Sequence, residues 1–158
     1  METTAPTYLE ALKKSEAYSD SPQKIKFEET QGSYLFHADA QLYKIKKTGN
    51  EFASLAVKEV FCREECRLLM HYNPEWTAEV VTLNRTESGY QLAGKEGEIE
   101  EYVLKMENLS ERRFLSSLIK KKNVGPADLS LAAVQLADIH ADSGMTVREG
   151  ETGKAERF

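Results

Sequence analysis

The sequence predicts an α+β fold, in which one helix packs on a face of an antiparallel sheet and further helices follow. Three observations predict it. Apolar and polar residues alternate in two groups of short segments, one before residue 48 and one after residue 77. A helical pattern at residues 52–72 separates the two groups, and only helical patterns follow residue 107. Alternation indicates strands and a period of 3.6 residues indicates helices, so strands and helices are largely segregated along the chain.

Length and composition indicate a soluble globular protein. The chain has 158 residues, of which 41% are hydrophobic and 30% charged, so it can bury a core without disulfide or metal staples. It contains no apolar run of about 18 residues or more, which a membrane-spanning helix needs. The N-terminus METTAPTYLEALKK lacks the pattern of a secretory signal. A cytoplasmic location is therefore expected.

The charge balance disfavours nucleic-acid binding. The 21 basic and 26 acidic residues give a formal net charge of −5, whereas nucleic-acid-binding proteins concentrate basic residues on one face. Recognition of a phosphate must therefore be local. The basic clusters that could provide it are Lys44, Lys46 and Lys47, and then Lys120, Lys121 and Lys122.

The cysteines are expected to be reduced thiols in the core. Cys62 and Cys66 are four residues apart within one helical pattern, where two side chains share a face but rarely reach disulfide geometry. A metal or redox pair is the alternative, but no second Cys or His pair completes a ligand set. No metal site is therefore predicted.

The first group of strands is predicted as an antiparallel meander. Its three strands are expected at residues 24–30, 33–39 and 41–47. Because side chains alternate between the two faces of a strand, Leu42, Lys44 and Lys46 should share one face of the third strand.

The helix predicted at residues 52–72 carries the most informative pattern of the chain. Ser54 can cap its first turn, and Pro74 prevents its continuation. The apolar stripe expected to pack on the sheet consists of Val57, Phe61, Leu68 and Tyr72.

Glu65 falls inside this stripe. Its neighbours at three and four residues are all apolar: Phe61, Cys62, Leu68 and Leu69. A carboxylate in such surroundings needs a cation, because burying an unpaired charge is costly. Glu64 is the second candidate, since Arg67 is also near it. A lysine on a strand that faces a helix carboxylate holds the nucleotide phosphates in kinase-like folds; the alternative is that these charges are only solvated.

The remaining segments complete the organisation of the chain. Two or three further strands are predicted at residues 78–84, 89–94 and 98–107, and two helices at residues 110–122 and 126–142, the second ending near His140. The chain then divides into a peripheral N-terminal helix and linker, a sheet with one helix, a helical region, and a mobile tail. These parts comprise residues 1–23, 24–107, 108–142 and 143–158.

The order of elements and several motifs resemble a known family. The chain is similar to the N-terminal kinase-like region of bacterial proteins related to aminoglycoside phosphotransferases, the kind in which this region precedes a P-loop ATPase domain. The resemblance covers about residues 29–141. The matching residues of the strands are Glu29-Thr30, Tyr34-Leu35-Phe36 and Tyr43-Lys44-Ile45-Lys46-Lys47, and those of the following helix and turn are Cys62, Glu64, Glu65, Arg67-Leu68 and Pro74-Glu75.

The resemblance implies a kinase-like small lobe: a five-stranded antiparallel sheet with one packed helix, followed by the first two or three helices of a large lobe. It implies that Lys44 contacts the nucleotide α- and β-phosphates, that Glu65 holds this lysine, and that the strand from Tyr102 to Met106 lines the adenine. Lys46 competes for the lysine role. The full set of implied nucleotide contacts is Leu42, Lys44, Lys46, Glu64, Glu65, Tyr102, Leu104 and Met106.

The chain also departs from the family pattern. Gln31 stands where the family has His, and Leu69 where it usually has Asn. Phosphoryl transfer needs a catalytic aspartate and acidic Mg²⁺ ligands, which related enzymes carry on a His-Gly-Asp-type motif and a later Asp. Neither motif follows His140. The chain therefore resembles a kinase-like fold truncated before the catalytic loop, with weak or lost ATP binding, no catalytic residue, and Mg²⁺ only if a large lobe is supplied.

Two other functions fit the same residues. The chain could be a non-catalytic interaction or regulatory module that has lost nucleotide binding. In that case a homodimer partner or a missing C-terminal domain would cover apolar surface on the helices of residues 108–142. The other alternative is a small-molecule-binding α+β domain unrelated to kinases.

Overall fold

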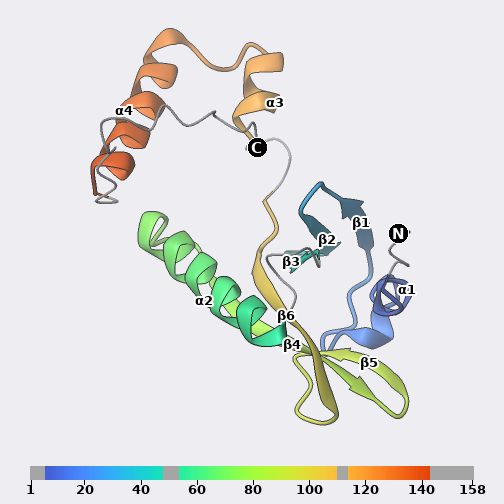
Figure 1. The fold of residues 1–158 in the computed structure, drawn as a ribbon. Coiled ribbons are helices and arrows are strands. Elements are labelled where there is room, and N and C mark those ends of the chain that lie inside the picture. Colours follow the sequence, from blue (N-terminus) through green and yellow to red (C-terminus); the bar gives the residue numbers. More distant parts are fainter. Residues whose placement is uncertain (1–5, 48–53, 110–113, 143–158) are drawn as a thin grey trace. The chain divides into compact units, whose positions relative to one another are not determined.

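The computed structural model describes residues 6–47, 54–109 and 114–142, and Figure 1 shows its fold. The chain forms two compact units, residues 1–109 and 110–158. No helix among the described residues has the length and apolar character needed to cross a membrane.

The first unit is a six-stranded antiparallel sheet with helices on its faces. The strand order is β1-β2-β3-β6-β4-β5. Its strands are β1 (Ile25–Glu29), β2 (Ser33–Ala38), β3 (Gln41–Lys46), β4 (Ala78–Thr86), β5 (Gly89–Leu92) and β6 (Glu98–Glu107). Its helices are α1 (Tyr8–Ala11), the 3₁₀ turn η1 (Ser15–Ala17) and α2 (Leu55–Tyr72). The α+β class, the three-stranded meander and the helix between the two groups of strands agree with the sequence prediction.

The number of strands differs from the five that the resemblance implies. All three alternating segments after α2 join the sheet, and the additional strand is the short β5. It pairs only with the far half of β4, from Leu83↔Leu92 to Thr86↔Gly89. A tight two-residue turn between β4 and β5 favours such a hairpin.

The strand registers define two faces of the sheet. Lys44 of β3 lies opposite Leu35 of β2 and Leu104 of β6, and Leu42 lies opposite Met106. Directly opposed residues of antiparallel strands point to the same side. Leu42, Lys44, Leu104 and Met106 therefore share a face, and this face packs against Cys66 and Leu69 of α2.

The N-terminal segment covers the other face and is part of the core. Tyr8, Leu9, Leu12, Ala17 and Tyr18 are all buried in one cluster with strand residues of β2, β3, β4, β5 and β6. The aromatic rings of Tyr18 and Tyr43 meet edge to face with centroids 5.2 Å apart. The prediction of a peripheral N-terminal helix is therefore wrong, because this short segment supplies the only helical cover of that face among the described residues of the first unit.

The packed face of α2 also differs from the prediction. Its buried residues are Lys58, Cys62 and Cys66, whereas Val57 and Phe61 of the expected stripe are 45% and 41% exposed. Ser54 caps the helix as predicted, since its Oγ accepts a hydrogen bond from the backbone N–H of Val57 at 3.3 Å. The small cysteine side chains allow the helix to lie close to β6, where the Cys62 thiol is 3.6 Å from the Tyr102 carbonyl oxygen.

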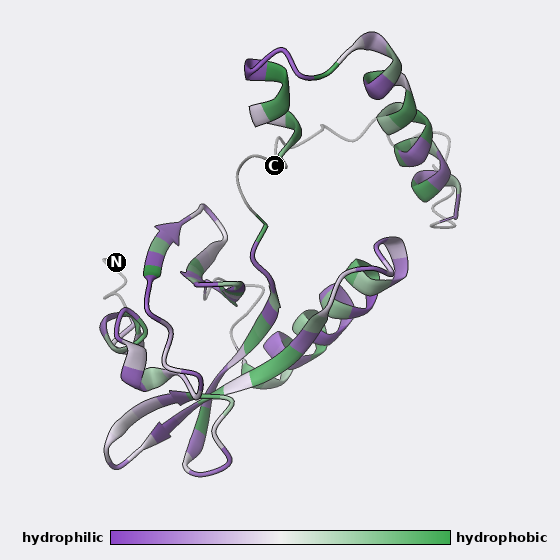
Figure 2. Cartoon of the chain, turned by 180° about the vertical axis from the view of Figure 1, so that it is seen from behind, coloured by the Kyte–Doolittle hydropathy of each residue, from purple (hydrophilic) through white to green (hydrophobic). Residues whose placement is uncertain are grey.

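The second unit contains α3 (Leu115–Lys120) and α4 (Pro126–Asp142). Asp128 caps the start of α4, its carboxylate accepting a hydrogen bond from the Gly125 N–H at 2.8 Å. None of the described residues of this unit is buried, although α4 is rich in hydrophobic residues (Figure 2). The predicted tail, residues 143–158, lies outside the described part of the chain.

Candidate functional site

Two lysines of β3 and one glutamate of α2 meet on the face of the sheet that α2 covers. The Lys44 ammonium donates a hydrogen bond to Glu65 Oε1, and both side chains are 23% exposed. Lys46 Nζ lies 3.9 Å from the other carboxylate oxygen, Oε2. Its ammonium also lies 4.8 Å from the centroid of the Phe61 ring. Glu65 is thus placed between two cations, of which Lys44 is the closer.

Local geometry explains why these groups meet. Residues 44 and 46 are two apart on β3, so their side chains leave the strand on the same side. Glu65 lies in the middle of α2, where its neighbours along the helix include the buried Cys62 and Cys66 and the partly buried Leu69. Glu65 is partly buried, with 23% of its side chain exposed, whereas Phe61 and Leu68 of the expected enclosure are 41% and 37% exposed.

A cavity of about 320 Å³ opens beside the ion pair. Leu35 and Leu42 of the sheet, Leu69 of α2 and Met106 of β6 form its apolar wall, while Lys44 and Glu65 form its charged wall. Thr30 and Ser33 of the turn between β1 and β2 complete the lining. The Thr30 hydroxyl and the Ser33 backbone bond to one another at 3.0 Å in both directions, which fixes this turn. The cavity therefore places an apolar wall beside the ion pair of Lys44 and Glu65.

Three of the predicted contact residues lie elsewhere. Glu64 is exposed and bonds both of its oxygens to Arg67, at 2.9 and 2.7 Å. Tyr102 is directed to Glu59, and this hydrogen bond raises the pKa of the Tyr102 hydroxyl. Leu104 is buried against Met106 and Cys66 rather than lining the cavity. The structure thus gathers Leu42, Lys44, Lys46, Glu65 and Met106 at one place.

Sequence reasoning missed a second ion pair that involves α2. Lys58 Nζ lies 2.5 Å from Glu101 Oε1 of β6, and the two side chains are only 8% and 6% exposed. The Tyr8 hydroxyl donates to the same oxygen at 3.1 Å. Burial raises the pKa of Glu101, although Lys58 opposes this effect. The available signal was the alternation of β6, which places Glu101 on the same face as the buried Val103.

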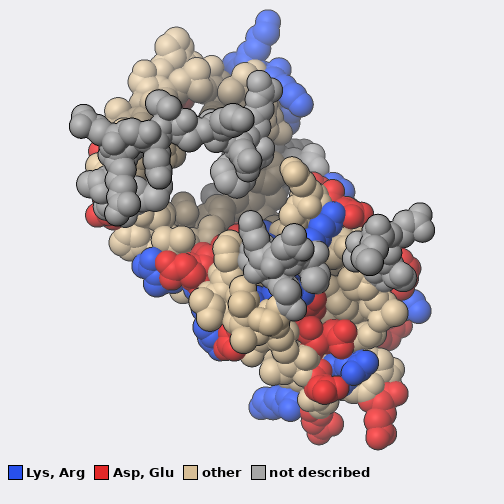
Figure 3. Space-filling view, in the orientation of Figure 1, with Lys and Arg blue, Asp and Glu red and all other residues tan. Residues whose placement is uncertain are grey.

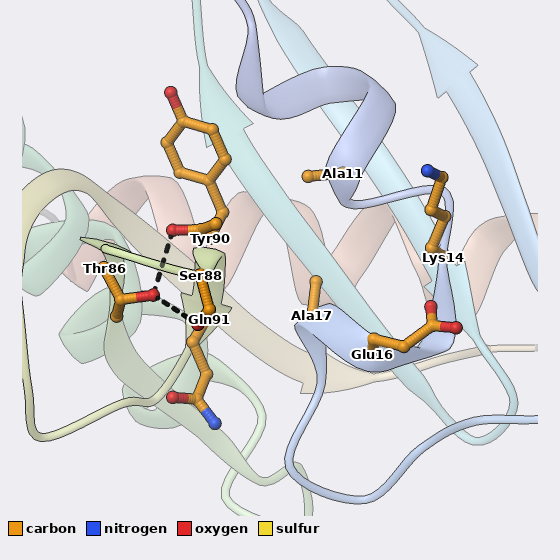
Figure 4. Close-up of a pocket in the computed structure, with 9 residues that line it drawn as sticks. Ala11, Lys14, Glu16, Ala17, Thr86, Ser88, Tyr90 and Gln91 are labelled. Carbon is orange, nitrogen blue, oxygen red and sulfur yellow. Dashed lines mark hydrogen bonds between the residues drawn. The ribbon is translucent and has the colours of Figure 1, made fainter.

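Another hollow lies between the N-terminal segment and the β4–β5 hairpin (Figure 4). It has a volume of about 510 Å³, and its polar lining includes Lys14, Glu16, Thr86, Ser88 and Gln91. Thr86 uses its hydroxyl within the hairpin, 3.0 Å from the Ser88 hydroxyl and 3.2 Å from the Gly89 carbonyl. The lining carries no buried charged group. It therefore indicates the class of ligand less clearly than the lining of the cavity beside Lys44.

Basic and acidic side chains are interspersed on the face shown in Figure 3, with no broad basic area there. In the described part of the chain, no three His, Cys, Asp or Glu side chains are grouped so that they could hold a metal ion. Comparisons of the chain with protein-family models, with curated proteins and with solved structures gave no match.

Proposed function

We propose that the cavity beside Lys44 and Glu65 binds a nucleotide, and that the chain is the ATP-binding part of a kinase-like, aminoglycoside phosphotransferase-like protein. The contact between Lys44 and Glu65 carries this proposal. In protein kinases a lysine on the third strand pairs with a glutamate of the helix that follows, and this lysine contacts the phosphates. Lys44 lies on the third strand of this sheet, and Glu65 on the helix between the third and fourth strands.

The chemistry of the cavity supports a nucleotide. The Lys44 ammonium is partly buried and can bind phosphate oxygens. Its partner Glu65 keeps the lysine side chain extended toward the cavity. The apolar side chains of Leu35, Leu42 and Met106 suit a purine ring, which is flat and largely apolar on its faces. Lys46 keeps a cation beside Glu65 when Lys44 turns to a phosphate.

The proposed function is binding without phosphoryl transfer by this chain alone. The sequence carries no His-Gly-Asp-type motif after His140, so a large lobe would have to provide the catalytic aspartate and the Mg²⁺ ligands. Without those ligands much of the phosphate charge stays uncompensated, and affinity for ATP should be weak. A cytoplasmic location belongs to the same proposal, because reduced thiols and ATP are both typical of that compartment.

A titration with ATP tests this proposal. We expect a dissociation constant of about a millimolar, with NMR shifts at cavity residues such as Leu42 and Met106, and little gain from added Mg²⁺. Lys44→Met should abolish these shifts. Lys105→Met is the matched control, because Lys105 pairs with the exposed Glu79 away from the cavity. If the NMR shifts are absent in the wild type, or unchanged in Lys44→Met, nucleotide binding at this site is refuted. If ATP binds tightly and only with Mg²⁺, the proposal that the site lacks its Mg²⁺ ligands is refuted.

The exposed apolar residues of α4 favour a second candidate, a non-catalytic interaction module. Leu131, Val134 and Leu136 are more than half exposed among the described residues, and apolar surface of this kind marks a binding face. A homodimer or a further domain of a longer protein would cover it. Sedimentation equilibrium separates the candidates: self-association that Leu131→Glu abolishes, together with absent ATP binding, would favour the interaction module.

A further inference from the structure

Three elements of the first unit converge on one buried carboxylate. Lys58 of α2 and Tyr8 of α1 both donate to Glu101 Oε1 of β6, at 2.5 and 3.1 Å. The second oxygen, Oε2, is buried and has no hydrogen-bond partner among the described residues. The side chains of Lys58 and Glu101 are almost completely withdrawn from solvent. Removal of either partner would leave the other as a buried uncompensated charge, which is strongly destabilising.

The residues of helix α2 that are buried have small or charged side chains. Only Lys58, Cys62 and Cys66 are buried among its residues, while its larger apolar residues Val57 and Val60 are exposed. The contact of Lys58 with Glu101 is also a charge-assisted hydrogen bond, whose strength depends on both its length and its angle. The two ion pairs of α2, Lys58 to Glu101 and Glu65 to Lys44, therefore restrain the helix together with the contacts of Cys62 and Glu59 with Tyr102.

We infer that Lys58 is a positioning residue for Glu65, and that the N-terminal segment of residues 6–18 sets the geometry of the Lys44–Glu65 pair through Tyr8 and Glu101. Lys58 and Glu65 are seven residues apart on one continuous helix, about 10 Å along its axis. A shift at the first anchor is carried to the second because the backbone between them is hydrogen-bonded throughout.

The N-terminal segment is well placed for this role. Tyr8, Leu9 and Leu12 are buried against the strands on the face opposite α2, so the segment cannot move without disturbing the core. Lys58 reaches Glu101 from the other side of the sheet. The Tyr8 hydroxyl thus connects the two layers through the carboxylate of Glu101. The consequence for nucleotide affinity rests on the proposed function, but the positional coupling does not.

Lysine-selective NMR of the full chain tests the positional coupling without any nucleotide. The reporter is the Nζ–H resonance of Lys44, which is assigned by its loss in Lys44→Met. We expect Lys58→Met to shift this resonance, Lys58→Arg to restore it, and Tyr8→Phe to shift it in the same direction by less. Lys105→Met is the control and should leave it unchanged, since Lys105 binds the exposed Glu79.

The outcomes separate this inference from the proposed function. An unchanged Lys44 resonance in folded Lys58→Met and Tyr8→Phe overturns the coupling; if Lys58→Met does not fold, Tyr8→Phe decides alone. If the resonance shifts but the wild type binds no ATP, the coupling stands and the proposed function fails. If ATP binds, its affinity should fall about fivefold or more in Lys58→Met and recover in Lys58→Arg. An unchanged affinity would overturn the link to the nucleotide.

Discussion

Lys44 on β3 and Glu65 on α2 lie 21 positions apart in the chain and meet at the edge of an apolar cavity. Lys46 lies 3.9 Å from the same carboxylate on its other oxygen. This arrangement makes Glu65 the common partner of two cations, while each lysine has the glutamate as its anion. The three residues are therefore expected to respond differently to substitution.

Glu65→Gln should destabilise the protein more than Lys44→Met. The glutamine leaves both lysines without their carboxylate, whereas removal of Lys44 leaves Lys46 beside Glu65. We expect a loss of about 1 to 2 kcal/mol for Lys44→Met, because the pair is partly shielded from water. Urea unfolding followed by circular dichroism measures the difference. A larger loss in Lys46→Met than in Lys44→Met would contradict the assignment of Lys44 as the closer partner.

Substitution of the apolar residue Val57 should destabilise the protein less than substitution of its charged neighbour Lys58. Val57 is 45% exposed although it is apolar, so Val57→Ala should change the free energy of unfolding by less than about 1 kcal/mol. Lys58 is buried with Glu101, and Lys58→Ala should cost about 3 to 5 kcal/mol because it leaves an unpaired buried carboxylate. Urea midpoints of the two variants provide the comparison. Equal losses would show that α2 packs through the stripe that contains Val57.

The face of α2 marks where sequence reasoning succeeded and where it failed. Alternation located the strands, and the enclosure of Glu65 together with the β3 alternation indicated a lysine partner, because both patterns are local. The packed face was wrong, since apolar residues surround most of α2 and spacing alone does not choose among them. The contacts of Glu101 with Lys58 and Tyr8 span 43 and 93 residues. No local pattern encodes such contacts, so only the folded arrangement reveals them.

The pH dependence of stability should report on Glu101. Loss of hydration on burial raises its pKa above the ordinary 4.5, against the lowering effect of Lys58 and Tyr8. The folded protein then holds this proton more tightly than the unfolded chain. The resulting stabilisation is complete below the ordinary pKa and is lost as the pH rises through the folded pKa. The wild type should therefore lose stability relative to Glu101→Gln as the pH rises from 4.5.

Urea midpoints of the two proteins across this range test the prediction, with Glu98→Gln as the control. Glu98 is an exposed residue of the same strand, and its substitution should leave the pH profile almost unchanged. A wild type that gains stability over Glu101→Gln with rising pH would place the pKa of Glu101 below its ordinary value.

Gly97 should tolerate no side chain. Its φ of +88° is unfavourable for other residues, and a Cβ atom there would lie 2.2 Å from the Arg85 carbonyl oxygen. Gly97→Ala must therefore displace backbone, and we expect a loss of about 2 kcal/mol or more. Gly32→Ala is the matched control, because a Cβ atom added at Gly32 would meet no other part of the described chain within 4 Å. Thermal unfolding distinguishes them; equal melting temperatures would mean that the turn before β6 relaxes freely.

The two cysteines should be unreactive until the protein unfolds. Burial raises the pKa of the Cys62 thiol to about 11, with the charge of Glu65 adding to the effect. Burial also raises the pKa of Cys66. At pH 8 only about one Cys62 side chain in a thousand is then a thiolate, which is the reactive form.

Cys62→Ser and Cys66→Ser each leave a single thiol, so that a colour-forming disulfide reagent can follow each site separately. Modification should be slow in buffer, complete within mixing in concentrated urea, and slower for Cys62 than for Cys66. Rapid modification of Cys62 in the folded protein would mean that α2 separates from β6 readily, and the contact between its thiol and the Tyr102 carbonyl would then not hold the helix in place.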